Sequence, residues 1–288
     1  GTPLLRAAVS HDRPAMVKRR RRMTLAAAQE SEIRKMLMMA ESSSVFDVET
    51  TTSSLNLTMD RDELNCKRDL GLATLVMVSN TFNTSTHALV LAISIFDRFL
   101  AKTVTVEPSL VKMPLAMTQN DIEMTTQAVE MPLACFIMAC KFCETYAPRL
   151  TDVVVAVGNR CAVQQLREAE NQILACLHWD IHSLTALDLI DKVLGFTTPR
   201  RQQQIKRKSE MGVKVACCSR SISKHKPAVL AVGVLLNACA QQDLGEDYLD
   251  FVPAFLLTNE ARACAQQIKA FIADHVRAHP SAQATAAA

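Results

Sequence analysis

The sequence predicts an all-α protein, and three observations support this expectation. Apolar residues recur at steps of three and four along most of the chain, which is the spacing of one helix face. Glycine is scarce, with seven residues in 288, whereas Ala, Leu and Met, which favour helices, are abundant. We find no segment with the alternation of apolar and polar residues that a half-buried strand requires.

The chain begins with a segment, residues 1–23, for which we expect little fixed structure. It contains a solid block of basic residues: Lys18, Arg19, Arg20, Arg21 and Arg22. Three interpretations of this block remain open. It could be a nuclear localisation signal, a site that attracts nucleic-acid phosphates, or a solvated tail without a specific role.

A short helix is predicted over residues 25–41, within a segment that we delimit as 24–59. Thr24 is a suitable N-cap for this helix. Ile33 and Met36 belong to its apolar face. The remainder of the segment is rich in Ser and Thr, and we interpret it as a linker.

From residue 60 onward, helical patterns follow one another in two groups, over 60–183 and 184–279. The first group is predicted to contain helices at 61–81, 86–101, 129–145, 149–157 and 162–178. The second is predicted to contain helices at 185–195, 199–221, 225–241, 247–256 and 259–278, followed by a tail over 280–288. Residues 103–127 exceed the usual length of a helix connection, so we interpret them as an insertion.

The two groups resemble each other, because each contains one helix that is apolar on all sides and opens at a proline. These helices begin at Pro132 and Pro227. A helix without a polar face is expected to be surrounded by other helices. The simplest architecture is therefore two five-helix repeats, each built around one central helix, preceded by the short N-terminal helix.

Four charged residues occupy positions on apolar helix faces. Arg68 and Asp97 interrupt the apolar stripes of the first two helices, Glu170 interrupts that of the fifth, and Lys141 closes an apolar run that begins at Met131. An unpaired charge on a buried face costs several kcal/mol or more. Each of the four therefore requires an opposite charge or a set of hydrogen bonds, supplied either by this chain or by another molecule.

Four short motifs resemble those of the cyclin family. Residues 97–100, Asp-Arg-Phe-Leu, resemble the end of the second cyclin helix, and residues 138–144, Met-Ala-Cys-Lys-Phe-Cys-Glu, resemble the signature of the third. Residues 167–174 resemble the Met-Glu-x-x-Ile-Leu of the fifth helix, and residues 177–181 resemble the Leu-x-Phe-x-Leu that follows. These motifs occur in order and at the family's spacing, so the chain is identified as a member of the cyclin family.

The resemblance implies a fold of two tandem cyclin boxes and a regulatory function. A cyclin is not an enzyme and has no catalytic residues, metal or cofactor of its own. It binds a cyclin-dependent Ser/Thr kinase and activates it by stabilising the inward, active position of the kinase's regulatory helix. We expect this protein to act in this way in cell-cycle control.

The resemblance also implies roles for individual residues. Arg68 and Asp97 form a salt bridge that joins the first two helices, while Lys141 and Glu170 hydrogen-bond the kinase backbone beside its regulatory helix. Apolar anchors of the contact are Phe142, Leu174, Trp179 and Ile181, and Ile33 and Met36 extend it to the other kinase lobe.

Other interpretations remain open at this point. From the residues alone, Lys141 and Glu170 could form an internal salt bridge, and Cys140 and Cys143 could take part in metal or redox chemistry rather than packing. The main rival function is that of a two-repeat transcription factor that grips promoter DNA, which predicts a basic face along the repeats. The mild net charge of +3 makes a nucleic-acid partner for the whole protein the less favoured choice.

Departures from the family pattern affect a groove in which mitotic cyclins bind Arg-x-Leu peptides. Lys67 and Thr74 stand at the positions of its Met and Trp, and Val129 at the position of a Gln. We therefore expect Arg-x-Leu peptides to bind poorly.

Composition suggests where the protein resides. Ten cysteines without a disulfide-like pattern suggest a reducing compartment, the nucleus or the cytoplasm. We expect no membrane span, no signal peptide and no small-molecule substrate.

Overall fold

The computed structural model describes residues 27–28, 30–39, 61–105, 126–195, 197–240 and 251–278. Regular secondary structure in these residues is helical throughout, which confirms the predicted all-α class. The chain divides into two compact units, residues 1–42 and 43–288. In the first unit, residues 30–39 form a helix that contains Ile33 and Met36.

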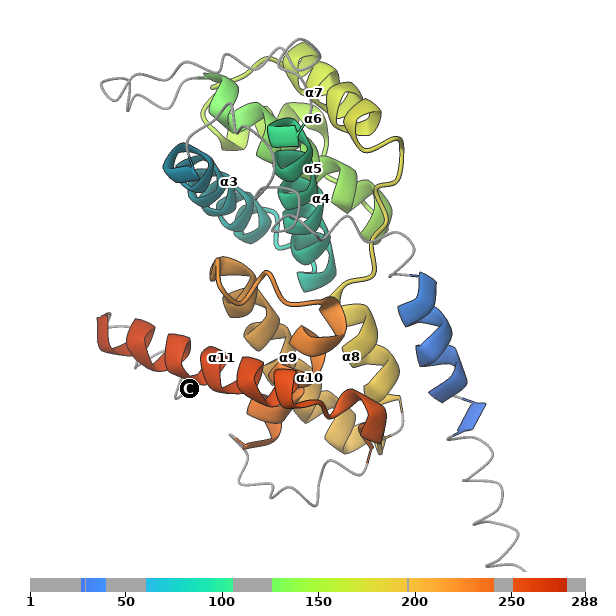
Figure 1. Cartoon of the computed structure of the whole chain (residues 1–288). Coiled ribbons are helices and arrows are strands. Elements are labelled where there is room, and N and C mark those ends of the chain that lie inside the picture. The colour runs from blue at the N-terminus through green and yellow to red at the C-terminus, as the bar shows by residue number, and fades with distance from the viewer. Residues whose placement is uncertain are drawn as a thin grey trace, which may run out of the picture. The chain divides into compact units, whose positions relative to one another are not determined.

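The first group of helices in the second unit is built around α5 (Figure 1). It consists of α3 (Arg61–Thr81), α4 (Thr86–Thr105), α5 (Thr126–Cys143), α6 (Leu150–Ala156) and α7 (Val163–Cys176). Helix α5 contacts α3, α4 and α7. All ten residues from Met131 to Cys140 are buried, so the apolar run forms the core of this group, as its composition requires.

The second group is built in the same way around α10 (Figure 1). It consists of α8 (Ala186–Leu194), α9 (Pro199–Cys218), α10 (Pro227–Ala240), a 3-10 helix η2 (Ala254–Leu256) and α11 (Asn259–Ala278). Helix α10 contacts α8, α9 and α11. Among the described helices, none combines the length and the apolar character that crossing a lipid bilayer demands.

Local sequence explains where several of these helices begin. At the start of α8, the Thr185 backbone N–H donates to the Asp188 carboxylate at 2.8 Å, and the Asp188 N–H donates to the Thr185 hydroxyl at 3.3 Å. This reciprocal capping box satisfies two backbone donors that would otherwise lack partners. Helix α9 begins at Pro199, whose missing N–H costs nothing in the first turn.

The predicted helix over 247–256 is wrong where the structure describes it. Of the described residues in this range, 251–253 are not helical, and 254–256 form the short η2. Pro253 explains the difference, because it has no N–H to donate and its ψ of 131° is extended rather than helical.

Other boundaries differ from the predicted ones by a few residues. Helix α4 continues to Thr105 and α5 begins at Thr126, so both ends of the predicted insertion are helical. Residues 106–125 lie outside the described residues. So do Thr24, the basic block at 18–22, the Ser/Thr-rich linker and the tail at 280–288.

Helices α3 and α4 approach closely at Gly71. A Cβ atom built at Gly71 would lie 2.1 Å from Cε1 and 2.3 Å from Cζ of Phe96. The phenyl ring therefore occupies the space where a larger residue would place its side chain. This contact positions α4, and with it the 97–100 motif, against α3.

Candidate functional site

The structure brings Lys141 and Glu170 together at the surface. Lys141 lies in the last turn of α5 and Glu170 in the middle of α7, and the Lys141 Nζ donates to Glu170 Oε1 at 2.5 Å. The lysine side chain is 53% exposed and the glutamate side chain 12% exposed. The internal salt bridge that the residues alone allowed is thus present, and its lysine is open to solvent.

The apolar residues named with this pair lie in the same two helices and in the segment that follows α7. Phe142 and Trp179 are exposed, at 54% and 73%, which is unusual for side chains of this size. Leu174, one turn after Glu170, and Ile181 are half-buried. We call these six residues, Lys141, Phe142, Glu170, Leu174, Trp179 and Ile181, the α5–α7 surface.

The end of α7 has a backbone conformation that turns the chain sharply. His178 and Trp179 have φ angles of 52° and 64°, in the left-handed region that non-glycine residues rarely adopt. The Trp179 N–H donates to the Leu174 carbonyl at 2.8 Å and so closes the helix. Two consecutive residues of this kind carry a strain of about 1–2 kcal/mol each, so the surrounding structure must hold them.

Arg98 supplies part of that support. It comes from α4, is 8% exposed, and its Nη2 donates to the backbone carbonyl of Asp180 at 2.6 Å. The same nitrogen forms a salt bridge with Asp180 Oδ2 at 3.1 Å. This arginine therefore fixes the chain immediately after the left-handed turn, between Trp179 and Ile181.

Phe142 has a neighbour that the sequence did not suggest. Its ring lies 5.1 Å from the ring of His182, with 36° between the two planes. Aromatic pairs at this distance attract each other. His182 thereby limits the positions that the exposed phenylalanine can take and links α5 to the segment after α7.

The Arg68–Asp97 pair lies at the junction of α3 and α4. Arg68 Nε donates to Asp97 Oδ1 at 2.7 Å, and Nη2 donates to Oδ2 at 2.9 Å, so the pair is bidentate. Burial raises the pKa of the Asp97 carboxyl, and the paired guanidinium opposes that shift. Arg68 also donates to the backbone carbonyl of Cys217 at 3.1 Å and to the Ser223 hydroxyl at 3.2 Å, which belong to the second group of helices.

Further polar contacts join the two groups of helices. His87 at the start of α4 lies 3.2 Å from Asp191 of α8, which also binds Lys206 of α9 at 2.9 Å. The hydrogen bond with Asp191 raises the pKa of His87. Burial alone would raise the pKa of Asp191, but its hydrogen bonds with His87 and Lys206 outweigh burial and lower it.

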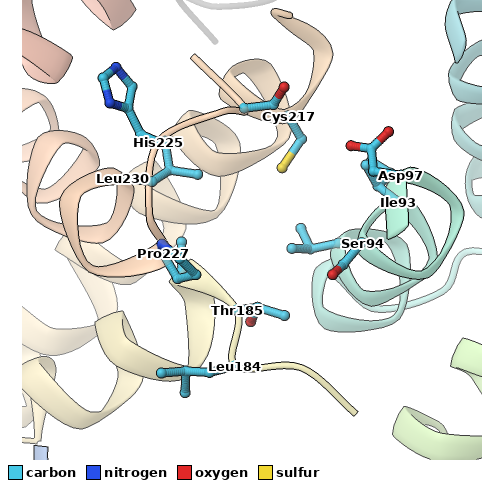
Figure 2. Close-up of a pocket in the computed structure, with 12 residues that line it drawn as sticks. Ile93, Ser94, Asp97, Leu184, Thr185, Cys217, His225, Pro227 and Leu230 are labelled. Atoms are coloured by element: carbon cyan, nitrogen blue, oxygen red, sulfur yellow. The ribbon is translucent and has the colours of Figure 1, made fainter. Parts of the chain in front are cut away.

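A small pocket lies beside this junction (Figure 2). Ile93 and Asp97 of α4 form one wall, and Cys217, His225 and Leu230 of the second group form the other. Burial raises the pKa of the Cys217 thiol to about 12, so at neutral pH this cysteine is an uncharged packing residue. We infer no ligand for this pocket, because Asp97, the carboxylate in its wall, is already paired with Arg68.

The structure also shows the environments of the two cysteines and of the groove residues that the sequence singled out. Cys140 is buried and Cys143 exposed, and both are free thiols. No group of three or more His, Cys, Asp or Glu within the described residues is arranged to hold a metal. Thr74 is buried with its hydroxyl donating to the Leu70 carbonyl, and Val129 is 2% exposed, so neither offers a polar group at the surface of the predicted groove.

Sequence patterns missed Arg98, His87 and His182 as contributors to the site. Arg98 follows Asp97 in the 97–100 motif, and its position in that motif was the single sequence feature that pointed to it. The two histidines have no helical spacing or motif that would connect them with Asp191 or Phe142, because both contacts join segments distant in the sequence.

The sequence model of the family described as "Cyclin, N-terminal domain" matches residues 35–182. Mouse cyclin-G2 is 25% identical over 189 residues, which cover 63% of this chain and 50% of that protein. Human G1/S-specific cyclin-D3 is 24% identical over 180 residues, which cover 57% of this chain and 61% of that protein. The chain thus spans only half to three fifths of the length of these relatives.

Solved structures show the same fold. A viral cyclin from herpesvirus saimiri aligns with a TM-score of 0.62 at 14% identity, over 84% of this chain and 96% of that one. A chain of the CAK complex from Chaetomium thermophilum bound to ATP-gamma-S aligns with a TM-score of 0.50 at 14% identity, over 83% of this chain and 74% of that one. Since the family's sequence model covers 148 of the 288 residues, the chain belongs to the cyclin family.

Proposed function

We propose that the α5–α7 surface binds a cyclin-dependent Ser/Thr kinase and that the protein is the regulatory subunit of that kinase. The observation that carries the proposal is the surface Lys141–Glu170 pair, in which the lysine is exposed and the glutamate largely buried, beside large apolar side chains. Protein interfaces typically combine exposed aromatic anchors with a few directed polar groups.

The chemistry of the pair suits a kinase helix end. A helix terminus presents backbone N–H and C=O groups without partners inside the helix. A glutamate accepts from such N–H groups and a lysine donates to such carbonyls. Because the Lys141 side chain is 53% exposed, its contact with Glu170 is only partly shielded from water, so the pair can exchange this contact for hydrogen bonds to the kinase.

Activation follows from differential binding. In cyclin-dependent kinases, the regulatory helix must point inward before its glutamate can pair with the catalytic lysine. A surface that binds the inward form better than the outward form raises the population of the active state. The cyclin contributes no catalytic group. Met36 of the N-terminal helix, which is half-buried, extends the contact to the other kinase lobe, whereas Ile33 is only 1% exposed and supports that helix from its buried side.

The setting of this activity is proposed from the relatives. Their names include a G1/S-specific cyclin and a G2/mitotic-specific cyclin, which supports a role in cell-cycle control. The basic residues at 18–22 would direct such a protein to the nucleus.

The test combines binding and phosphotransfer. The chain is mixed with a panel of cyclin-dependent kinases, and affinity and kinase activity are measured for the wild type, Lys141→Ala and Glu170→Ala. Charge-assisted hydrogen bonds contribute about 1.5–3 kcal/mol each, so each variant should bind about tenfold or more weakly and stimulate correspondingly less.

Glu168→Ala is the matched control, because Glu168 is an exposed glutamate of the same helix whose hydrogen bond, among the described residues, is with Gln164. It should bind and stimulate like the wild type. Failure to bind or stimulate any kinase, or equal activity of all three variants, would refute the proposal.

A further inference from the structure

Besides the basic block at 18–22, positive charge is concentrated in one stretch of the second group of helices. Residues 199–226, which span α9 and the following loop, contain nine lysines and arginines and a single glutamate. The whole chain has a net charge of +3, so the other residues together carry a net charge of −5. The kinase surface proposed above uses α5 and α7 and makes no use of this charge.

Helix α9 has a buried face and, opposite to it, a face that carries basic residues. Ile205, Ser209, Val213 and Ala216 are buried, at positions separated by three or four residues, and pack where α9 contacts α8 and α10. Arg200, Arg207 and Lys214 follow one another at intervals of seven, which places them together on the opposite side of the helix. We call these three residues the basic face of α9.

The basic face is open to solvent and carries one acidic residue, the half-buried Glu210, which lies three residues after Arg207 and four before Lys214. Arg200 and Arg207 are exposed and Lys214 is half-buried. Within the part of the chain that the structure describes, none of the three forms an ion pair, whereas Lys206 on the flank of the helix binds Asp191. Met211 lies between Arg207 and Lys214 on the same face and is 62% exposed, so the face also offers an apolar contact.

The spacing of the charges indicates what kind of anion fits. Seven residues of helix rise about 10.5 Å, so the three cations form a row about 21 Å long. An extended peptide advances about 3.3 Å per residue, so carboxylates three residues apart match this row. A phosphate is instead usually gripped by several cations that converge on one point.

Charge elsewhere on the molecule limits the length of the partner. A nucleic-acid duplex carries one negative charge per about 1.7 Å of its axis and would extend well past a row of 21 Å. The residues outside 199–226 carry a net charge of −5 in total, so the chain as a whole offers a duplex little further attraction. No Trp, Tyr or Phe occurs in residues 199–226 to stack on a base.

We propose that the basic face of α9 is a docking site for a short acidic, Asp/Glu-rich peptide segment of a partner protein. The peptide binds in an extended conformation along α9, its carboxylates meet Arg200, Arg207 and Lys214, and an apolar side chain contacts Met211. This site is independent of the kinase surface and gives the second repeat a recruiting function of its own.

The test uses fluorescence anisotropy with the full chain. The probe is a labelled peptide of about twelve residues with glutamate at every third position and Ser, Gly and one Leu between them, and the same peptide with Gln in place of Glu is its neutral counterpart. We expect the acidic peptide to bind and the neutral one not to bind at low salt. Affinity should fall as salt rises, because exposed charges are screened.

Variants test whether the acidic peptide binds at the basic face of α9. The triple variant Arg200→Gln, Arg207→Gln, Lys214→Gln should bind the acidic peptide about tenfold more weakly, since three exposed ion pairs are lost. A matched triple variant, Arg149→Gln, Lys269→Gln, Arg277→Gln, removes the same charge from exposed positions elsewhere and should bind like the wild type. Replacement of Arg200 and Arg207 by Lys should preserve binding of the acidic peptide. Lys141→Ala, which should weaken kinase binding, should leave the affinity for this peptide unchanged.

Thermal unfolding of each variant establishes that it is folded. The proposal is overturned if the acidic peptide does not bind, if the two triple variants weaken binding equally, or if a twenty-base-pair DNA duplex binds more tightly than the peptide. The last result would favour the rival nucleic-acid function.

Discussion

Gly71 and Glu130 both occupy helix positions that look unfavourable, and the neighbouring residues explain only the first. Glycine in a helix interior usually costs about 0.5–1 kcal/mol relative to alanine. At Gly71 the Phe96 ring fills the space that a Cβ would need. Glu130 is a buried carboxyl whose Oε1 has no hydrogen-bond partner, so its cost is not offset by any contact of that oxygen.

Gly71→Ala should destabilise the protein, although alanine is the better helix former. The new methyl group would collide with the ring of Phe96, and overpacking of this kind costs about 1–3 kcal/mol. The free energy of unfolding in urea measures the effect. The double variant with Phe96→Leu should recover part of the loss, and an alanine variant as stable as the wild type would show that the ring can move away freely.

Glu130→Leu should stabilise the protein, and more so at pH 8 than at pH 4.5. Burial, followed by the nearby Glu168, raises the pKa of Glu130 above its usual value of 4.5. A group whose pKa is raised by folding contributes stability below its unfolded pKa and loses it as pH rises through the folded pKa. An unsatisfied buried acceptor costs about 1–3 kcal/mol, which sets the expected gain.

Urea unfolding of both proteins at the two pH values measures this difference. A leucine variant that is less stable than the wild type at pH 8 would contradict the interpretation. Glu168→Leu is a useful comparison, since Glu168 is exposed and its replacement should change stability little.

At the scale of helices and connections, most elements could be predicted from the sequence because the information is local. Helices over 61–81 and 259–278 have the predicted bounds, since apolar periodicity and polar breaks define both ends. The prediction of a helix over 247–256 was wrong because it followed the apolar periodicity and disregarded Pro253. The left-handed turn at His178 and Trp179 could not be predicted, because neither residue type favours it and its support comes from another helix.

Arg98→Lys should loosen that turn. Arg98 holds both the carbonyl and the carboxylate of Asp180, and a lysine has a single nitrogen with a different reach. Trp179 is the only tryptophan in the chain, so its fluorescence reports on this segment without labelling. Acrylamide quenching should increase, and stability should fall by about 1–3 kcal/mol with the loss of buried charge-assisted hydrogen bonds.

Arg149→Lys is the control, because the Arg149 side chain is exposed and caps no backbone group of α6. It should leave both quenching and stability unchanged. Unaltered quenching in Arg98→Lys would show that the turn does not depend on the guanidinium.

At the scale of the whole molecule, sequence patterns could not predict the contacts between the two repeats. Arg68 was expected to pair with Asp97, but its hydrogen bond to the Cys217 carbonyl depends on how the repeats pack. The same holds for the contact of His87 with Asp191. Helix periodicity specifies which face is buried, whereas these contacts depend on residues more than a hundred positions apart.

The contact between His87 and Asp191 should make stability depend on pH. Hydrogen bonding to Asp191 raises the pKa of His87 above its usual value of 6.5, with Asp188 adding to the shift and Lys206 opposing it. This contribution is complete below pH 6.5 and is lost as pH rises through the folded pKa. Both side chains are about one-third exposed, so we expect a loss of only about 0.5 kcal/mol.

The comparison between wild type and His87→Gln measures this contribution, because other titrating groups are common to both. Urea unfolding from pH 6 to pH 8.5 should show the wild type losing its advantage over the variant. A constant difference between the two proteins across this range would exclude the histidine as the cause.

Arg68 has a consequence for how the protein unfolds. Its guanidinium binds a carboxylate of its own repeat and a carbonyl of the other, and it is 12% exposed. Separation of the repeats would remove the hydrogen bonds of the guanidinium to Cys217 and Ser223 while Asp97 remained bound. Detachment of the second repeat would therefore leave part of a buried charge without its hydrogen-bond partners. The two cyclin repeats are therefore expected to melt in one cooperative calorimetric transition, and the first repeat, cut out by itself, would be a poor substitute for the intact protein in any assay of folding.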